Sequence, residues 1–416
     1  MKHTLIVILL LMLAPGLFSQ VDLVIEGEEI IDTETGISTG YSIPRAQVTN
    51  LIFRNNSLIS VNSAGYMLQA GDEIAGLNIN HLKGAVITGN RFTWNGTDED
   101  SWTHALFTGY NLDVIIKYNY LHNTPNGIQR KSDGMTDEAG VVAYNIIKNP
   151  KVGIVVKGMN GVRIYNNTLY TEKTNAQSSR GLIDIHSNTD DGLNAPSAGT
   201  KVFNNIFYTK YQTYCINVWD VESLEGFESD YNVFYCESGS PVFNAGGTDK
   251  TFEQWQAMGY DLHSVVVDPG FADFTDFVPV ERLNYGVDLG EEFTAGLTVD
   301  AVWGTLDPET VSQGDEWQVG ARIYETEVEV EELPENVTLI YPNPTSGSFY
   351  VLMTDPDQVF DIVRMYDPHG RLVLEHQLAP GRTMIPIPDY LAPGLYSIFL
   401  EAQGIDPCIS KLIVVY

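Results

Sequence analysis

Hydrophobic and polar residues between positions 50 and 235 follow one short recurring pattern. An apolar pair, an Asn, one further residue and a large apolar side chain return roughly every 20–40 residues, with strand-like alternation and no helical period. The copies are centred on Asn56, Asn90, Asn119, Asn145, Asn167, Asn205 and Asn232. Repeats of this length predict a solenoid in which each copy forms one coil.

The recurring Asn suits a corner that is shared by every coil. Its amide offers both a donor and an acceptor, so each copy can bond the local backbone and the Asn one coil away. The flanking apolar residues alternate in and out and would fill the interior. We therefore predict an all-β protein, a right-handed parallel β-helix, which is followed by a small antiparallel β-sandwich.

Four segments are expected along the chain. Residues 1–20 have the basic start, short apolar run and small residues of a secretory signal peptide. Residues 21–325 would form the β-helix, and 236–325 would close its last coil, which otherwise exposes a sheet edge. An acidic linker, 326–337, precedes the sandwich at 338–416, where apolar residues alternate between Pro and Gly.

The C-terminal segment carries motifs that resemble a known export domain. They are Tyr341–Gly347 (YPNPTSG), Gly370-Arg371, Gly394-Leu395-Tyr396 and the closing Lys411–Val414. This set resembles the C-terminal sorting domain of the type IX secretion system of Bacteroidetes. The resemblance implies handling by the type IX secretion machinery and a secreted or cell-surface location. A carbohydrate-binding sandwich is the alternative interpretation, because the same fold serves both.

Charge and cysteine content narrow the class of protein. The net charge of −31 argues against nucleic acid or an anionic membrane as partner, and no later apolar stretch is long enough to span a bilayer. Three Cys are too few for a disulfide framework. We expect Cys215 and Cys236 to be buried thiols rather than a disulfide, Cys408 to be unpaired, and the protein to be a monomer.

Basic residues concentrate in one segment of this acidic chain. Residues 117–180 hold nine Lys and Arg against four Asp and Glu, which predicts an electropositive patch for an anionic ligand. Solvated loop lysines are the alternative interpretation.

Aligning the coils on a recurring Gly places two of these lysines together. Lys131 and Lys157 fall at the same offset on successive coils, with Ile185 or His186 next, and Arg130 shares an offset with Asp184. Because neighbouring strands stack about 4.8 Å apart, matched offsets become a column on one face.

A column of cations suits β-elimination from a uronate polymer. That reaction needs a cation to neutralise the sugar carboxylate, a base for the C5 proton and an acid for the leaving O4. Lys131 is the expected base, since adjacent positive charges lower the pKa of a Lys. Arg130 is an expected neutraliser of the carboxylate, and Lys157, Arg180 or His186 would serve the acid side. Substrate contacts are expected from Arg130, Lys117, His104, Asp184 and Tyr110.

Part of this segment resembles the β-helix alginate and dermatan (chondroitinase B-like) lyases. Those enzymes place a base Lys before a Tyr-Asn-x-apolar rung and a catalytic Arg after the next Gly. Here Lys131-Ser132, Tyr144–Ile147 and Gly153 match, while Lys157 stands near the place of the Arg after a longer interval. The resemblance implies calcium as a carboxylate neutraliser. Oxygens of Asp133, Asp137 and Glu138 could hold it, and an ordinary polar turn is the alternative.

The leading interpretation is a secreted polysaccharide lyase acting on an acidic polysaccharide. The alternatives are a noncatalytic glycan-binding or adhesion β-helix, and a uronan epimerase or glycosidase on the same scaffold. A glycosidase needs two carboxylates at a fixed separation, and the repeat region offers no matching Asp pair, Asp184 included. The acidic segment Thr189–Gly192 is interpreted as a turn.

Overall fold

The computed structural model of the chain describes residues 21–32, 37–39, 48–61, 65–71, 84–97, 102–109, 113–132, 140–173, 180–304, 307–324, 338–341, 343, 345, 348–353, 359–379, 382–388, 390–402 and 405–415. Its contacts divide the chain into two compact units, 1–326 and 327–416. The predicted signal peptide and linker lie outside the described residues.

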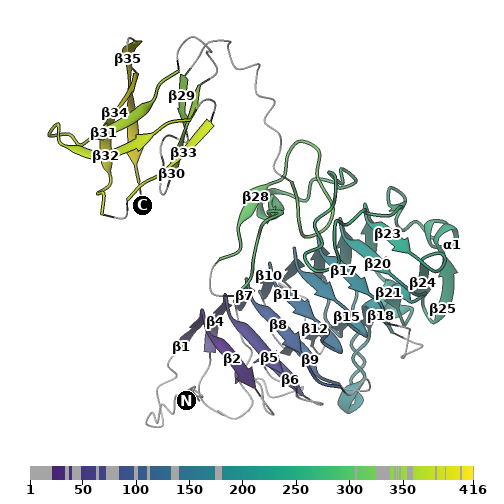
Figure 1. Cartoon of the computed structure of the whole chain (residues 1–416). Coiled ribbons are helices and arrows are strands. Elements are labelled where there is room, and N and C mark those ends of the chain that lie inside the picture. The colour runs from purple at the N-terminus through teal and green to yellow at the C-terminus, as the bar shows by residue number, and fades with distance from the viewer. Residues whose placement is uncertain are drawn as a thin grey trace, which may run out of the picture. The chain divides into compact units, whose positions relative to one another are not determined.

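The first unit is a stack of β coils in which each coil gives one strand to each of three sheets (Figure 1). Sheet A contains β1 (Val21–Glu26), β4 (Val48–Arg54), β7 (Val86–Thr88), β10 (Ile115–Lys117), β13 (Val141–Ala143), β16 (Arg163–Tyr165), β19 (Lys201–Phe203) and β22 (Glu228–Asp230). Sheet B contains β2 (Glu29–Asp32), β5 (Ser57–Ser60), β8 (Arg91–Trp94), β11 (Tyr120–His122), β14 (Ile146–Lys148), β17 (Thr168–Thr171), β20 (Ile206–Thr209), β23 (Val233–Cys236) and β26 (Val265–Val266).

Sheet C forms the third wall and carries the residues of interest for function. Its strands are β3 (Ile37–Thr39), β6 (Tyr66–Gly71), β9 (His104–Gly109), β12 (Asn126–Lys131), β15 (Val152–Lys157), β18 (Gly181–His186), β21 (Tyr214–Val218), β24 (Val242–Ala245) and β25 (Thr248–Thr251). Neighbours pair in parallel except β24 and β25, which are antiparallel. The predicted parallel β-helix is confirmed.

The recurring Asn residues occupy the corner between sheets A and B, as predicted. The backbone N–H and the side-chain amide of Asn145 both donate to Oδ1 of Asn167 on the next coil, each at 3.0 Å. The same pair of bonds joins every neighbouring pair from Asn56 to Asn232. We call this row the Asn ladder. It satisfies polar groups that burial would otherwise leave without water.

The corner imposes an unusual backbone on the residue before each ladder Asn. Tyr118, Tyr144 and Tyr231 have φ of 59°, 54° and 55°, in the left-handed region that bulky residues rarely adopt. The ladder hydrogen bonds on both sides hold these residues in this unfavourable conformation.

The ladder ends on a buried carboxylate. Asn232 donates to Oδ1 of Asp261 at 2.8 Å, and Ser264 donates to the same oxygen at 2.6 Å. Oδ2 accepts from Ser229 and from the indole of Trp255, both at 2.7 Å. Because the backbone N–H of Asn232 donates to Oγ of Ser264, Asp261 and Ser264 together take the place that a further Asn would hold.

The interior of the coils is an apolar column. Fully buried side chains such as Phe53, Phe92, Ile147 and Phe207 belong to one continuous cluster. Cys215 lies within it, and both Cys215 and the buried Cys236 are free thiols, which confirms that prediction. Burial raises the pKa of the Cys215 thiol.

The segment that was predicted to close the last coil does more than that. Helix α1 (Phe252–Gln256) inserts Trp255 against Phe243 at the end of the stack, with ring centroids 5.0 Å apart. The chain then returns along the corner between sheets A and B. Val265 N–H donates to Asn232 O, Gly320 N–H to Asn204 O, and the Trp303 indole to Tyr118 O.

This returning segment covers aromatic side chains that point out of the coils. It includes η3 (Glu291–Phe293), β27 (Ala295–Leu297) and β28 (Thr310–Ser312). Its residues Phe274, Phe277 and Trp303 pack against the buried rings of Tyr120, Tyr170 and Tyr208. Apolar rings on an outer face need such cover because exposing them to water is unfavourable.

The second unit consists of two antiparallel sheets around their own core. One contains β29 (Thr338–Tyr341), β30 (Ser348–Met353) and β33 (Arg382–Pro386). The other contains β31 (Ile362–Tyr366), β32 (Leu372–Gln377), β34 (Gly394–Ala402) and β35 (Ile405–Val414). Phe349, Ile398 and Leu412 are fully buried between them. Within the described parts of both units, no helix is long and apolar enough to cross a membrane.

Candidate functional site

Three side chains stand at the ends of adjacent strands of sheet C. Lys131 ends β12, Lys157 ends β15 and His186 ends β18. The register pairs Lys131 with Lys157, and Lys157 with His186. The predicted column of two lysines is therefore confirmed, and the next position belongs to His186 rather than Ile185.

The predicted pairing of Arg130 with Asp184 is wrong by one residue. Arg130 aligns with Val156 and Ile185, whereas Asp184 aligns with Val155 and, one coil further, Gln129. Gly181 begins β18 one position earlier than the alignment on Gly assumed. Because side chains alternate across a strand, this slip places the two residues on opposite faces of sheet C.

Arg130 consequently points into the interior rather than toward a ligand. Its side chain is fully buried, with Nη2 placed 3.1 Å from the sulfur of Met159. Burial lowers the pKa of its guanidinium to about 9. A side chain in this position does not reach a polymer on the surface, so we leave Arg130 out of the site.

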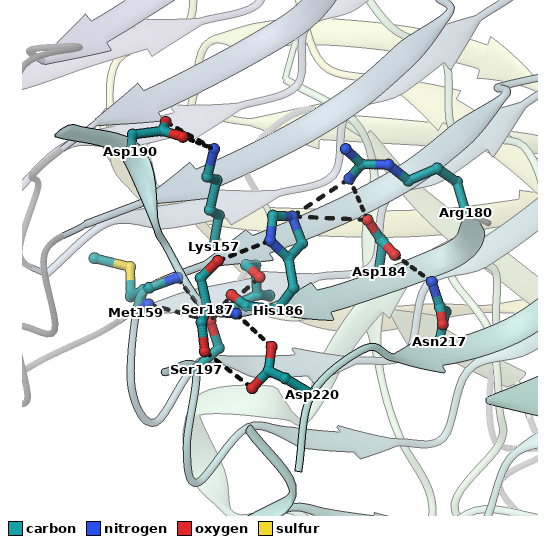
Figure 2. A network of polar contacts seen from close by, with 12 residues as sticks. Lys157, Met159, Arg180, Asp184, His186, Ser187, Asp190, Ser197, Asn217 and Asp220 are labelled. Atoms are coloured by element: carbon teal, nitrogen blue, oxygen red, sulfur yellow. Dashed lines mark hydrogen bonds and ion pairs between the residues drawn. The ribbon is translucent and has the colours of Figure 1, made fainter. Parts of the chain in front are cut away.

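A carboxylate bridges the two lysines of the column. Oδ2 of Asp190 lies 3.0 Å from Nζ of Lys131 and 2.7 Å from Nζ of Lys157 (Figure 2 shows the second contact). Its Oδ1 also accepts a bond from Lys157 at 2.8 Å. Partial burial opposes ionisation of Asp190, but these bonds hold its pKa below the usual value. We call the three residues the Lys–Asp bridge.

Asp190 begins the turn η1 (Asp190–Gly192), which starts four residues after the last residue of β18, His186. The root of this turn is anchored by Asn188, which is fully buried. Asn188 donates to Ser132 O at 2.7 Å and exchanges two backbone bonds with Ala195. The predicted turn at Thr189–Gly192 is confirmed, and it also brings an acid to the lysine column.

Beside the bridge lies a second polar cluster on the same face of sheet C. Arg180 donates to Oδ2 of Asp184, and its Nη1 lies 3.3 Å from Nε2 of His186 (Figure 2). The side chain of Asn217 donates to the other oxygen of Asp184 at 2.6 Å. Asp184 is fully buried, so a guanidinium and an amide offset the unfavourable burial of its charge. Burial raises the pKa of Asp184, against these bonds.

His186 faces this cluster as a neutral ring at pH 7. Its Nδ1 lies 3.0 Å from Ser187 O, which assigns the proton to Nδ1 and leaves the Nε2 lone pair toward Arg180. Burial lowers the pKa of His186, although the charge of Asp184 opposes this. A neutral imidazole with a lone pair on Nε2 can accept a proton.

His104, a predicted substrate contact, lies on β9, three coils before the Arg180 cluster on β18. Burial lowers its pKa to about 4, and the positive charge of Arg180 adds to this effect. The side chain packs against Tyr66 and Phe107, with ring centroids 5.4 and 6.3 Å away. It therefore borders the site as a neutral, packed ring.

Lys117, by contrast, does not belong to this face. It lies on sheet A, where it donates to Glu292 O at 2.7 Å and its ammonium stands 4.8 Å from the ring centroid of Phe293. Arg163 on the same sheet pairs with Glu292. The basic segment 117–180 is thus divided among the three sheets, because each coil turns through all of them, and it does not form one patch.

Four predicted residues cannot be placed. Tyr110 and the proposed calcium ligands Asp133, Asp137 and Glu138 lie outside the described residues. Elsewhere in the described part of the chain, no cluster of three or more His, Cys, Asp or Glu is arranged to hold a metal ion. A calcium site stays a prediction.

Sequence reasoning missed Asp190 and Asn217. The only signal for Asp190 was an acid-rich segment that follows the column within four residues of His186. Asn217 lies in β21 between apolar residues and outside the recurring pattern, so it had no comparable signal.

Comparison with known families agrees with both units. Residues 17–169 match the model of the right handed beta helix region, and residues 339–415 match that of the secretion system C-terminal sorting domain. No curated protein matches the chain. No solved structure matches it either. The chain is therefore a right-handed parallel β-helix protein that is exported through the type IX secretion system to the cell surface or the extracellular space.

Proposed function

We propose that the protein binds an acidic, uronate-containing glycan at the strand ends of β12, β15 and β18 and cleaves it by β-elimination. One observation carries the proposal: the ammonium groups of Lys131 and Lys157 converge on a single carboxylate, within 3.0 and 2.7 Å of the same oxygen. The two lysines are thus already spaced to hold a carboxylate jointly. A uronate presents the same group on each sugar.

The lysine pair supplies the first requirement of the reaction. Two ammonium groups on a uronate carboxylate withdraw negative charge from it, which makes the C5–H bond more acidic and stabilises the enolate-like transition state. In this role Lys131 is a carboxylate contact, whereas the sequence favoured it as the base. The change follows from the placement of its Nζ beside Lys157 and against an acid.

His186 is the proposed base. Its Nε2 takes the C5 proton, the C5–H electrons form the C4=C5 double bond, and the C4–O4 bond breaks with its electrons on O4. The resulting imidazolium returns that proton to O4, so atoms and charge balance. A ring that is neutral at pH 7 has the lone pair that this step needs.

Arg180 is placed to stabilise the leaving oxygen. Its guanidinium lies 3.3 Å from Nε2 of His186, so an O4 that receives the proton there also lies within reach of an Arg N–H. The buried carboxylate of Asp184 orients the guanidinium of Arg180, and Asn217 holds that carboxylate in turn by donating to its other oxygen.

A noncatalytic glycan-binding function is the second candidate. It is favoured by the contact between Arg180 and Nε2 of His186, because a lone pair that accepts an Arg N–H is occupied. In that case the lysine pair binds uronates and no elimination follows.

The experiment incubates the full chain with alginate, pectate and chondroitin and follows the ultraviolet absorbance of the unsaturated product, with binding measured in parallel by calorimetry. We expect product from at least one polymer, loss of product but not of binding in His186→Ala, and weaker binding by about tenfold or more when Lys131 and Lys157 become Met. Lys201→Met, an exposed lysine on sheet A paired with Glu228, is the matched control.

The outcomes separate the candidates. Binding without product across the polymers excludes the lyase and supports the glycan-binding protein. Equal binding by a carboxyl-reduced polymer, or by the double Met variant, contradicts both.

A further inference from the structure

We propose that Asp190 is a specificity-determining residue that occupies the carboxylate site and must be displaced by the ligand. The inference rests on the proposed function of the lysine pair and adds to it a competitor within the chain. Uronates enter only by exchanging their own carboxylate for that of Asp190.

The contacts of Asp190 make the two states mutually exclusive. A single oxygen, Oδ2, touches both ammonium groups, and Oδ1 takes a further bond from Lys157. A ligand carboxylate that spans the two lysines needs the same space between them. Because the incoming group and the resident group have the same chemistry, the exchange replaces like with like and loses no class of interaction.

The exposure of the three side chains shows which one is outermost. Asp190 is 41% exposed, whereas Lys131 and Lys157 are 10% and 19% exposed. The acid therefore covers the lysines from the solvent side. Its departure uncovers two ammonium groups at once, and its presence screens them from neutral or weakly acidic ligands.

The tip of the turn, Asp190–Gly192, can move away from the lysines while the flanking residues that anchor the turn stay in place. Asn188 and Ala195 are joined by two backbone bonds, and Ser197 between β18 and β19 is fully buried and accepts bonds from Gly158 and Met159. In the described part of the tip, the backbone N–H of Asp190 donates to Oδ1 of Asn188, and Leu193 N–H donates to Asp190 O. Gly192 has a φ of 79°, and no described heavy atom outside its chain neighbours lies within 4 Å of the position that a Cβ would take there.

Because the Asp190 carboxylate already occupies the site, a ligand must bind strongly enough to displace it. A group tethered by a short turn competes at an effective concentration in the millimolar range or above, so a single uronate in dilute solution displaces it poorly. A polymer that touches several positions of sheet C has further contacts to offset the displacement. Asp190 thus selects chains of uronates over single sugars.

The test measures binding of glucuronate and galacturonate monosaccharides to the full-length protein by calorimetry. Asp190→Ala and the isosteric Asp190→Asn are each expected to bind the monosaccharide at least about tenfold more tightly than the unmodified protein. Asp191→Asn removes the same charge from the next residue of the turn and is expected to change affinity less than about twofold. Circular dichroism and thermal unfolding verify that each variant is folded.

Each outcome decides one question. Unchanged or weaker binding in both Asp190 variants, with polymer binding intact, overturns the competitor and leaves the proposed function standing. An equal gain in Asp191→Asn also overturns it, because general charge then explains the effect. If neither the unmodified protein nor the Asp190 variants bind any uronate or polyuronate, the proposed function fails, and the inference fails with it.

Discussion

The Asn ladder and the Lys–Asp bridge are both rows of side chains that run across successive coils. They differ in how far they repeat, in their charge and in their exposure to water. The ladder repeats one residue type from Asn56 to Asn232, fully buried and with identical bonds at each step. The bridge spans two coils, joins unlike charges and is partly open to water. Uniform repetition with every polar group satisfied serves the fold. A local interruption by charges that remain accessible is the mark of a site.

The largest effect is expected from breaking the ladder in its middle. Asn145→Ala removes an amide that donates to Asn167, Ile116 O and Ala143 O and accepts from Asn119. Several buried polar groups lose their partners, so the free energy of unfolding should fall by about 3–5 kcal/mol in urea unfolding.

Asn284 is the control for the ladder variant, because it is an exposed Asn of the returning segment whose side chain donates to Glu316. Its change to Ala should alter stability by less than about 0.5 kcal/mol. A loss below about 1 kcal/mol for Asn145→Ala would show that water or neighbouring groups replace the ladder bonds.

The end of the ladder should be the next most sensitive point. Asp261→Ala leaves Asn232, Ser229, Ser264 and Trp255 without their shared acceptor, with an expected loss of about 2–4 kcal/mol. Asp261→Asn keeps one acceptor oxygen and should lose less. Equal losses in the two variants would mean that shape rather than hydrogen bonding terminates the stack.

Replacing both lysines of the bridge should separate stability from binding. The Lys131→Met, Lys157→Met double variant should unfold within about 1 kcal/mol of the unmodified protein, since partly exposed ion pairs contribute little. Its affinity for polyuronates should fall by about tenfold or more, as calorimetry would show. A stability loss as large as that of Asn145→Ala would place the bridge with the ladder as a structural element.

The smallest effect is the pH dependence of the bridge. The lysine bonds lower the pKa of Asp190, so its contribution to stability is present above the usual aspartate pKa and is lost as pH falls through the lowered value. The unfolding free energies of the unmodified protein and Asp190→Asn should differ by about 0.5 kcal/mol at neutral pH and converge in acid. A difference that grows as pH falls contradicts this sign.

Much of the scaffold could be read from local pattern. The ladder Asn residues, the parallel coils and the two free thiols Cys215 and Cys236 all follow from residue type and spacing, because each coil repeats the same requirements. The sorting domain could also be predicted from the sequence, since its motifs lie together in one short segment that a family model also matches.

Only part of the site could be predicted from the sequence. Lys131 and Lys157 could be paired because their coils have matching lengths and starts. The positions of Asp184 and Arg130 could not be predicted, because a shift of one residue at Gly181 moves a side chain to the opposite face of the sheet. The spread of Lys117 and Arg163 onto another sheet has the same origin, since position around a coil decides which wall a charge occupies.

The sequence alone determined the β-helix, the ladder that holds its corner and the sorting domain, since these depend on repeated local patterns. Only the tertiary structure decided that Arg130 is enclosed, that the returning segment covers the outer tyrosines, and that Asp190 reaches Lys157 from 33 positions away. The physical reason is the same for all three. Composition and period fix what a strand buries, whereas contacts between separate coils and loops depend on register and on the path of the chain between them.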